Sequence, residues 1–471
     1  MKSLFLNIVF ALYAVFATAQ NKLSLKQAIE TGIANNLDVN QAGLQMEKAD
    51  INLKQSKASM LPNLNAFGNH GTNQGRSIDP FTNAFINQNV NYANYGASSN
   101  ILLFNGSFLH NQIKSNALGF EASKMELQQA KDNLTINIIL AYLQVLSSED
   151  ILEVSREQKS VTDSQVIRLS VLNQSGAIAP SQYFDLKGQL ANDEITIVDN
   201  HAAVETAKLS LSQLLNIPYD KNMEIERLPE EAFSIMYDNT PEQIYQTALQ
   251  QFAQIKSVHL RMQSAEKNIS SLRGQLYPTL SLNGNINTNY SSVASQEFFV
   301  NSTEIPSADY VVINGTQTPV ITKQNNYNNK KIAYSNQLNN NLFTTFSLGL
   351  NIPLFNAWQV KNKIKLAKID FKNTQLVEQN TKVILQQSIE RAYINLTSSS
   401  DKYKLLLSQV NSFNESFRAA EIRFNAGAST SVDFLIAKNN LDKARSNLII
   451  SKYDFVLREK VLDYYQGKAL W

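Results

Sequence analysis

An internal duplication constrains the fold of this chain more than any other feature of its sequence. Several segments recur at one offset of 251 residues (392 − 141): Ala141-Tyr142 as Ala392-Tyr393, Leu103-Phe104-Asn105 as Leu354-Phe355-Asn356, Gly176 as Gly427, and the series Leu190, Ile197, Val204, Leu211 as Leu441, Leu448, Phe455, Leu462. A constant offset over so much of a chain marks repeated structural units. The sequence therefore predicts two copies of one structural plan.

The second copy carries an insertion. Upstream of the strands the offset is only 216 residues (278 − 62), because Leu61-Pro62-Asn63-Leu64 matches Tyr277-Pro278-Thr279-Leu280. The difference of 35 residues (251 − 216) must lie between Leu280 and Asn351, in sequence rich in Asn, Ser and Thr. Exposed loops tolerate such insertions. We therefore expect a long polar loop at about 291–340.

Each copy is expected to run helix, strand, loop, strand, very long helix, tight turn and long helix. Prolines mark the breaks, because proline ends a helix and restricts the residue before it. The expected division is a first repeat at 20–216, a connector at 217–240 that holds Pro218 and Pro229, and a second repeat at 241–471. Within the repeats we expect these segments: β-hairpins at about 63–104 and 279–352, and long helices at about 106–175, 177–216, 358–425 and 428–466.

The expected helical segments are much longer than the helices of ordinary globular domains. No proline occurs between Pro80 and Pro180, and none follows Pro353. The segment 106–175 alone would extend on the order of 100 Å as a helix. Apolar residues seven apart, as in the series from Leu190 to Leu211, form coiled-coil seams that need neighbouring helices to cover them. Taken alone, these helices also suit a fibrous coiled coil or a helical adaptor.

The segments of the second hairpin alternate between apolar and polar residues. The apolar positions are Leu280, Leu282, Ile286, Phe346, Leu348, Leu350 and Ile352, with Ser and Asn dominating between them. Strands of roughly ten residues cross an outer membrane when tilted, with apolar side chains facing lipid and polar side chains facing a water-filled lumen. A half-buried hairpin of a soluble domain would show the same alternation.

Four strands per chain are too few to enclose a pore. Open sheet edges in lipid leave backbone groups unpaired, at a cost of several kcal/mol each. Several chains must then share one barrel, and a cyclic trimer would close it with twelve strands. The expected fold class is mainly α with a β-barrel part, with four strands and long coiled-coil helices from each protomer of a homotrimer.

The N-terminus indicates export. A basic start, an apolar stretch from Leu4 to Val15 and the sequence Ala17-Thr18-Ala19 predict a signal peptide at 1–19. No later run of about eighteen consecutive apolar residues appears, so we do not expect helical membrane spans. The chain has no cysteine, so neither disulfides nor a lipid-modified cysteine can stabilise or anchor it, and its net charge of +2 gives no case for nucleic acid.

Three segments together resemble the outer-membrane factor, or TolC-like, efflux family: Tyr277-Pro278-Thr279-Leu280 before a strand, Ile352-Pro353-Leu354-Phe355-Asn356 after one, and Phe424-Asn425-Ala426-Gly427-Ala428-Ser429-Thr430 with Asp433, Leu441 and Ala444 around a helical turn. The resemblance implies a trimeric channel-tunnel in the outer membrane of a Gram-negative bacterium, with a twelve-stranded barrel, an α-helical barrel in the periplasm and an equatorial region at 217–240. It also implies a periplasmic adaptor (membrane fusion protein) and an inner-membrane pump.

The two helical turns are the candidate functional site. Gly176 and Gly427 stand where long helices reverse, and glycine accepts the left-handed conformation that ends helices. The resemblance implies that these turns, with Ala177, Ala428, Ser429 and Thr430, form the periplasmic mouth where an adaptor docks. It also implies a gate at Asp433 and Phe424, in which three copies of Asp433 form a carboxylate ring. A plain helix-terminal carboxylate is the alternative for Asp433.

No sequence pattern indicates a catalytic, metal-binding or cofactor-binding site. The four histidines make no metal-ligand spacing, and the chain shows no nucleophile elbow, P-loop or dinucleotide-binding motif. We expect neither catalytic residues, nor a metal site, nor a cofactor. The expected function is the passive exit duct of a tripartite efflux or type I secretion system, and the alternative is a non-pore periplasmic coiled-coil structural or adaptor protein.

Overall fold

The computed structural model describes residues 22–79, 83–229 and 239–468, so the predicted signal peptide lies outside the described residues. The chain divides into two compact units, and both copies contribute to each. Among the described residues, the first unit contains 22–52, 115–229, 239–266 and 369–468 and is mainly helical. The second contains Leu53–Lys114 and Lys267–Lys368, without 80–82, and holds the strands.

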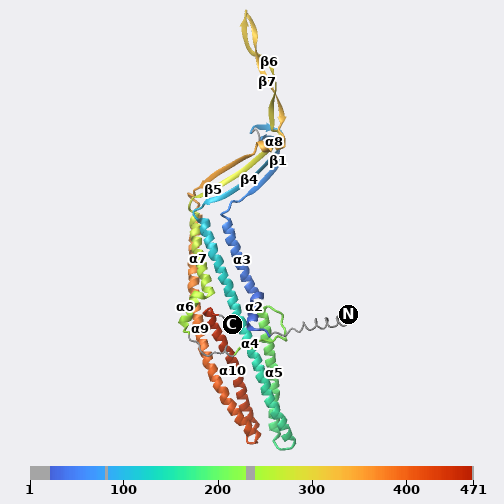
Figure 1. The fold of residues 1–471 in the computed structure, drawn as a ribbon, viewed down its shortest axis with the longest axis vertical. Helices are drawn as coiled ribbons and strands as arrows, with labels where there is room; N and C mark the ends of the chain where they lie inside the picture. Colours follow the sequence, from blue (N-terminus) through green and yellow to red (C-terminus); the bar gives the residue numbers. More distant parts are fainter. Residues whose placement is uncertain (1–21, 80–82, 230–238, 469–471) are drawn as a thin grey trace, which may run out of the picture. The chain divides into compact units, whose positions relative to one another are not determined.

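The second unit is built around one four-stranded antiparallel sheet. Its strands are β1 (Asn65–Asn73), β4 (Val90–Phe104), β5 (Thr279–Ser291) and β8 (Phe343–Asn351), in the order β1-β4-β5-β8 (Figure 1). Strands β4 and β5 pair along most of their length and so join the two copies. Among the described residues, no strand pairs with the outer edge of β1 or of β8.

The sheet has one apolar and one polar face. Directly paired residues lie on the same face of a sheet, and two neighbouring positions of β5 show the two faces. Leu282 pairs with Ile101 on one side and Leu348 on the other, whereas the next residue, Asn283, pairs with Asn100 and Ser347. The amide of Asn100 donates to the side chain of Asn283 across the polar face. The side chain of Phe346 lies over Gly284, where an added Cβ would meet its Cε1 at 3.2 Å. Phe346 and Leu348 are nevertheless 77% and 67% exposed in the single chain.

The predicted loop at 291–340 is instead a long hairpin of its own. Strands β6 (Ser295–Ile313) and β7 (Thr316–Lys331) pair with each other, and α8 (Tyr334–Asn340) follows them. Asn314 and Gly315 form a two-residue turn in which both φ angles are positive, at 52° and 85°. Such a turn matches the twist of a hairpin, and its Asn-Gly sequence was the available signal. Among the described residues of the first copy, the corresponding place holds only β2 (Arg76–Ile78) and β3 (Phe85–Asn87).

The helices repeat in length between the copies. In chain order they are α2 (Leu25–Asn35), α3 (Leu37–Ala58), α4 (Phe108–Gln174), α5 (Pro180–Leu215), α6 (Pro241–Gln251), α7 (Ala253–Gly274), α9 (Gln359–Asn425) and α10 (Ser431–Tyr465). Helices α4 and α9 have 67 residues each. Ser24 and Thr240 each begin a helix with a capping box that includes a glutamine three residues later.

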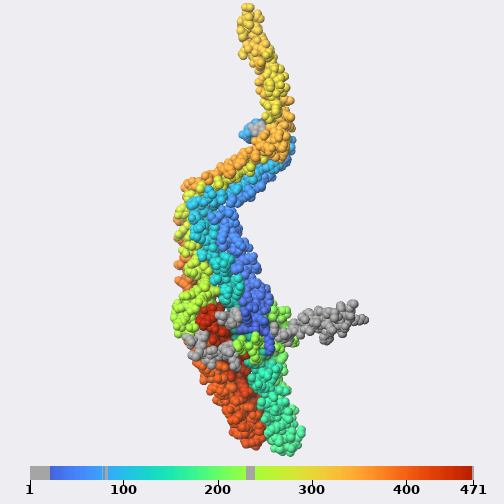
Figure 2. All heavy atoms as spheres, viewed as in Figure 1, coloured from blue at the N-terminus to red at the C-terminus, as the bar shows by residue number. Residues whose placement is uncertain are grey.

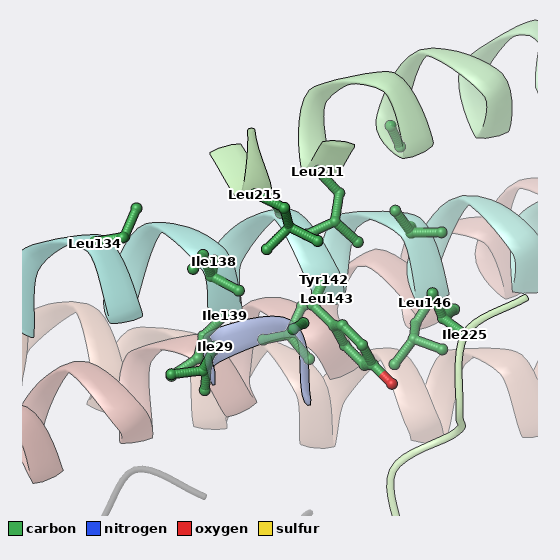
Figure 3. Packing of buried hydrophobic residues seen from close by; sticks show 14 of the residues in the cluster. Ile29, Leu134, Ile138, Ile139, Tyr142, Leu143, Leu146, Leu211, Leu215 and Ile225 are labelled. Carbon is green, nitrogen blue, oxygen red and sulfur yellow. The ribbon is translucent and has the colours of Figure 1, made fainter. Parts of the chain in front are cut away.

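The core of the helical unit surrounds the middle of α4. The buried side chains of Ile138, Tyr142 and Leu146 meet Leu211 and Leu215 of α5 and Ile29 of α2 (Figure 3). The hydroxyl of Tyr142 donates to the main-chain oxygens of Leu23 and Glu226, at 2.9 and 2.6 Å, and thereby fixes the connector against the start of the chain. Among the described residues, α4 is the one helix with a segment long and apolar enough to cross a membrane, and 56% of that segment is buried, as in a core helix.

Candidate functional site

The two tight turns between long helices have the same backbone geometry. Gly176 and Gly427 both have a φ of 71°, which glycine adopts without a steric penalty. Ala177 N–H donates to Leu172 O at 2.9 Å, and Ala428 N–H donates to Arg423 O at 2.8 Å. These bonds, with a second from each glycine, close the helix ends in a Schellman motif.

The helices that follow the two turns begin differently. Thr430 caps α10: its Oγ1 accepts from Asp433 N–H at 3.2 Å, while the Asp433 carboxylate accepts from the Thr430 hydroxyl at 2.8 Å. In the first copy Ala179 caps α5 without a side chain, and Pro180 occupies the first helical position. The hydrogen bonds from the Thr430 hydroxyl and N–H lower the pKa of Asp433, and the positive charge of Arg423 lowers it further.

Phe424 is buried inside the helical unit. It is 4% exposed and stacks on Phe434, with ring centroids 4.9 Å apart, and Leu169 and Leu186 complete the cluster. These residues come from α9, α10, α4 and α5. In the single chain the predicted gate residue Phe424 therefore packs the two helical pairs together, while Asp433 remains exposed.

Arg168 joins α4 to the end of α9 and was not identified from the sequence. Its Nη2 donates to Asn425 O at 2.8 Å and to Phe424 O at 3.3 Å, and its guanidinium lies 5.6 Å from the centre of the Phe424 ring. Another hydrogen bond links Nη1 to the Asn425 side chain. A residue of α4 thus satisfies carbonyls at the end of α9, which no partner within that helix can reach.

A groove of about 840 Å³ separates the two turns. Figure 2 shows the α4–α5 and α9–α10 ends beside each other. The groove is lined by Arg168, Leu172, Ala177, Ile178 and Gln182 on one side and by Phe424, Asn425, Gly427 and Ser429 on the other, among others. The Ser429 hydroxyl is buried without a hydrogen-bond partner in the described chain. Of the predicted tip residues, Gly176, Ala428, Thr430 and Asp433 lie outside this lining.

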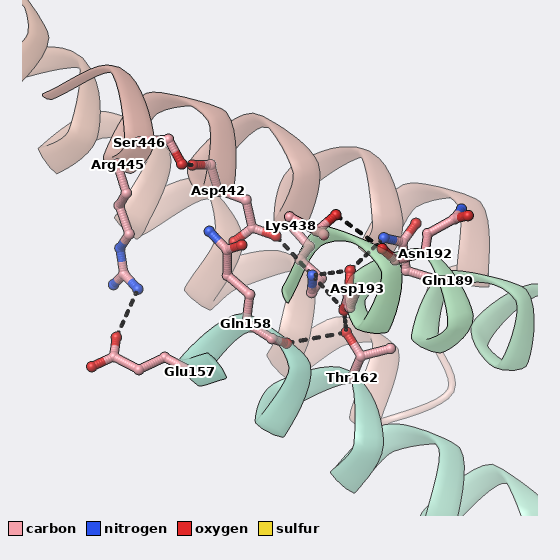
Figure 4. A network of polar contacts seen from close by, with 11 residues as sticks. Glu157, Gln158, Thr162, Gln189, Asn192, Asp193, Lys438, Asp442, Arg445 and Ser446 are labelled. Atoms are coloured by element: carbon pink, nitrogen blue, oxygen red, sulfur yellow. Dashed lines mark hydrogen bonds and ion pairs between the residues drawn. The ribbon is translucent and has the colours of Figure 1, made fainter. Parts of the chain in front are cut away.

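A buried charged network connects α5 and α10 a few turns from the tip (Figure 4). Lys438 is 2% exposed and donates to Asp193 at 3.1 Å and to Asp442 at 2.7 Å. Asp193 also accepts from Gln189 at 2.7 Å and from the Thr162 hydroxyl of α4. Burial raises the pKa of Asp442, while the charge of Lys438 opposes that shift. The network has no duplicate, because Ala444 occupies the position that corresponds to Asp193 (193 + 251).

No metal site is evident in the described ranges, where no three Asp, Glu or His side chains cluster closely enough to hold an ion. His259 instead contacts Glu378 at 3.2 Å, and Lys382 contacts the same carboxylate at 2.7 Å. Burial would raise the pKa of Glu378, but the hydrogen bonds from Lys382 and His259 outweigh burial and lower it.

The chain was compared with protein families and with individual known proteins. A family described as "Outer membrane efflux protein" matches residues 28–216 and 244–467. The chain is 20% identical to toxin and drug export protein A of Aggregatibacter actinomycetemcomitans, over 93% of this chain and 85% of that one. It is 21% identical to the outer membrane protein TolC of Salmonella enteritidis, over 99% and 86% of the two chains.

Solved structures share the fold. CusC aligns with a TM-score of 0.76 at 16% identity, covering 95% of this chain and 93% of the other. VceC of Vibrio cholerae aligns with a TM-score of 0.74 at 13% identity, covering 95% and 97%. These similarities confirm the predicted fold class of one protomer, a duplicated TolC-like channel-tunnel subunit with four strands and long coiled-coil helices.

Proposed function

This chain belongs to the outer membrane efflux protein family, and from that premise we propose that three copies form one passive duct through the outer membrane of a Gram-negative bacterium. The duct would be the exit of a tripartite efflux or type I secretion system. The relatives named for toxin and drug export and for TolC support this function over a non-pore periplasmic coiled coil.

The observation that carries the proposal is the open, two-faced sheet. Strands β1 and β8 leave their outer edges without a strand partner among the described residues, and Leu348 and Leu350 stand 67% and 63% exposed on one face. The unpaired edges are not stable alone in lipid, because backbone groups need partners there, whereas the exposed apolar face suits lipid and not water. Pairing β8 of one copy with β1 of the next closes a ring, and three copies supply twelve strands.

The turns support the docking of a periplasmic adaptor. The groove between them offers apolar walls, such as Leu172 and Ile178, and a buried Ser429 hydroxyl that lacks a partner in the described chain. A helical hairpin that enters the groove would cover the walls and could supply that hydrogen bond. We place adaptor docking at Gly176, Ala177, Gly427, Ala428, Ser429 and Thr430.

The gate is proposed at the same end of the helical unit. Asp433 is exposed beside the α9–α10 turn, so three symmetry-related copies would bring like charges together and would attract cations. Phe424 would act from inside the subunit, because its buried ring holds α9 against α10 and α4. An inner-membrane pump must supply the energy, since a passive tube performs no chemistry.

Reconstitution tests the duct. The purified protein should form heat-labile trimers in detergent and discrete conducting steps in planar bilayers. Leu348→Lys places a charge on the apolar face and should reduce insertion strongly, because lysine near the bilayer centre costs about 2–4 kcal/mol. Ser347→Lys is the matched control on the polar face and should insert normally. A soluble monomer without conductance, or equal insertion of the two variants, would overturn the proposal.

A further inference from the structure

Positive charge is concentrated where the strands of the second unit meet the helices. Segments 53–64, 105–114, 267–278 and 352–368 flank β1, β4, β5 and β8 at one end of the sheet (Figure 1). Together they hold nine Lys or Arg residues and no Asp or Glu: Lys54, Lys57, Lys114, Lys267, Arg273, Lys361, Lys363, Lys365 and Lys368. The whole chain is nearly balanced, with 42 basic and 40 acidic residues. We call these nine residues the basic collar.

The four collar lysines of α9 are exposed, and three of them form a stripe. Lys361, Lys365 and Lys368 follow the spacing i, i+4, i+7, which places them on one face of the helix. Within the described ranges none of the three makes an ion pair with a carboxylate. Lys361 Nζ instead lies 4.2 Å from the centre of the Trp358 ring. This stripe therefore has three cations available to an external anion.

Exposed apolar side chains lie between the collar and the sheet. Leu64 precedes β1, Tyr277 precedes β5, and Phe104 ends β4; all three are exposed. After β8, Leu354 is 93% exposed and Phe355 is 76% exposed. Aromatic and apolar residues next to lysines are the composition of a membrane–water interface, where rings sit at the headgroups and lysines reach outward to water.

We propose that the basic collar binds anionic phospholipid headgroups of the leaflet that faces the periplasm. This inference rests on the proposed function, which puts the sheet in the outer membrane with its helices on the periplasmic side. Lysines close to an anionic surface each strengthen binding about fivefold. The exposed Trp358 and Phe355 beside the stripe favour lipid over a soluble anion in the duct, because a water-filled lumen would not accommodate bare aromatic rings.

The test counts lipids bound to the full-length trimer. Native mass spectrometry in nonionic detergent would compare phosphatidylglycerol with phosphatidylcholine. We expect a preference for phosphatidylglycerol that weakens with salt. The triple variant Lys361→Gln, Lys365→Gln, Lys368→Gln should lose on the order of 100-fold in phosphatidylglycerol affinity. Arginine at the same three positions keeps the charge and should keep the preference.

A matched control removes charge elsewhere. Lys402, Lys404 and Lys443 are exposed on helices of the first unit, so their replacement by glutamine should leave the lipid preference intact. Equal binding of the two lipids by the wild type, or an unchanged preference in the collar variant, overturns the inference. If the collar variant instead relieves channel block by a soluble polyanion while its lipid preference is unchanged, the collar faces the duct and the inference is wrong. Bilayer conductance of the same wild-type sample tests the proposed function independently.

Discussion

Arg168 Nη2 donates to the main-chain oxygen of Asn425 at 2.8 Å, so the long helix of the first copy caps the long helix of the second. The same guanidinium lies over Phe424, whose ring is buried against Phe434. One side chain of α4 thus holds the end of α9. If the duct opens by separation of these helical pairs, this contact must break.

Arg168→Ala should loosen the tip without unfolding the protein. The variant leaves the Phe424 and Asn425 carbonyls without that donor, and hydrogen bonds from charged groups contribute about 1.5–3 kcal/mol. We expect larger or more frequent conducting steps and faster proteolysis at the turns. Lys159→Ala is the control, because it removes only a surface contact with Glu194. Unchanged conductance with Arg168→Ala would exclude a closing role for this residue.

We predict that Asp433 makes the conductance of the duct depend on pH and on cations. Thr430 lowers the pKa of this carboxyl, so its charge is present above its ordinary pKa and persists somewhat below it as the pH falls. If three copies of Asp433 form a ring, divalent cations should block the duct at neutral pH, and acid should relieve the block. Asp433→Asn should abolish the block, whereas Thr430→Ala disturbs the cap but keeps the charge and should retain it. Cation titration of single-channel conductance measures both variants.

The buried network predicts a pH-dependent stability. Lys438→Met leaves Asp193 and Asp442 without their cation, and breaking a buried pair in this way costs about 3–5 kcal/mol. Because burial raises the folded-state pKa of Asp442, its contribution is present at low pH and is lost as pH rises through that pKa. Asp442→Asn should flatten this part of the profile. Thermal unfolding from about pH 3 to 8 measures both effects. A Lys438→Met variant with wild-type stability would contradict the first, and an unchanged pH profile in Asp442→Asn would contradict the second.

The sequence revealed the large elements because their signals are long and repeated. The repeat offset holds over four heptad positions, and segments such as 106–175 contain no proline. These signals identify the helices without knowledge of their tertiary contacts. The hairpin β6–β7 was missed because its composition is polar, although Asn314-Gly315 marked the turn. The polar composition of this segment indicates that it is exposed to solvent. It does not indicate strand pairing, which depends on the turn sequence and on the alternation of side chains along the strands.

Contacts between distant helices could not be predicted in the same way. Arg168 lies 257 residues from Asn425, and Lys438 lies 245 residues from Asp193. Neither contact is repeated in the other copy, so the duplication gives no hint of it. The burial of Phe424 likewise depends on Leu169 and Leu186, which the packing of α4 and α5 brings to it. The roles of Asp433, Phe424 and the tip glycines in gating and docking remain predictions.

The hairpin β6–β7 should be dispensable for the duct. It forms a separate two-stranded sheet and does not pair with β1, β4, β5 or β8 in the described chain. Its two ends already meet, since Ile332 N–H donates to Ala294 O at 3.1 Å, so a Gly-Ser link in place of 295–331 would span the gap. Trimer yield and conductance should remain within about twofold of wild type, because loop closure costs depend only weakly on length. Loss of trimers would show that this hairpin takes part in assembly.

Docking of the adaptor is tested at Gly427. This residue has a φ of 71°, and a Cβ added there would meet no atom within 4 Å, so backbone conformation rather than space limits substitution. Asn tolerates the left-handed region, so Gly427→Asn should fold and support efflux. Gly427→Glu adds a longer charged side chain beside the groove and should abolish adaptor co-purification and efflux while trimers persist. Both variants carry some backbone strain at residue 427. A difference between them in efflux or adaptor co-purification therefore reports on the surface beside the groove. Equal efflux in the two would place the adaptor elsewhere, whereas loss of trimers in both would show that the turn acts in folding.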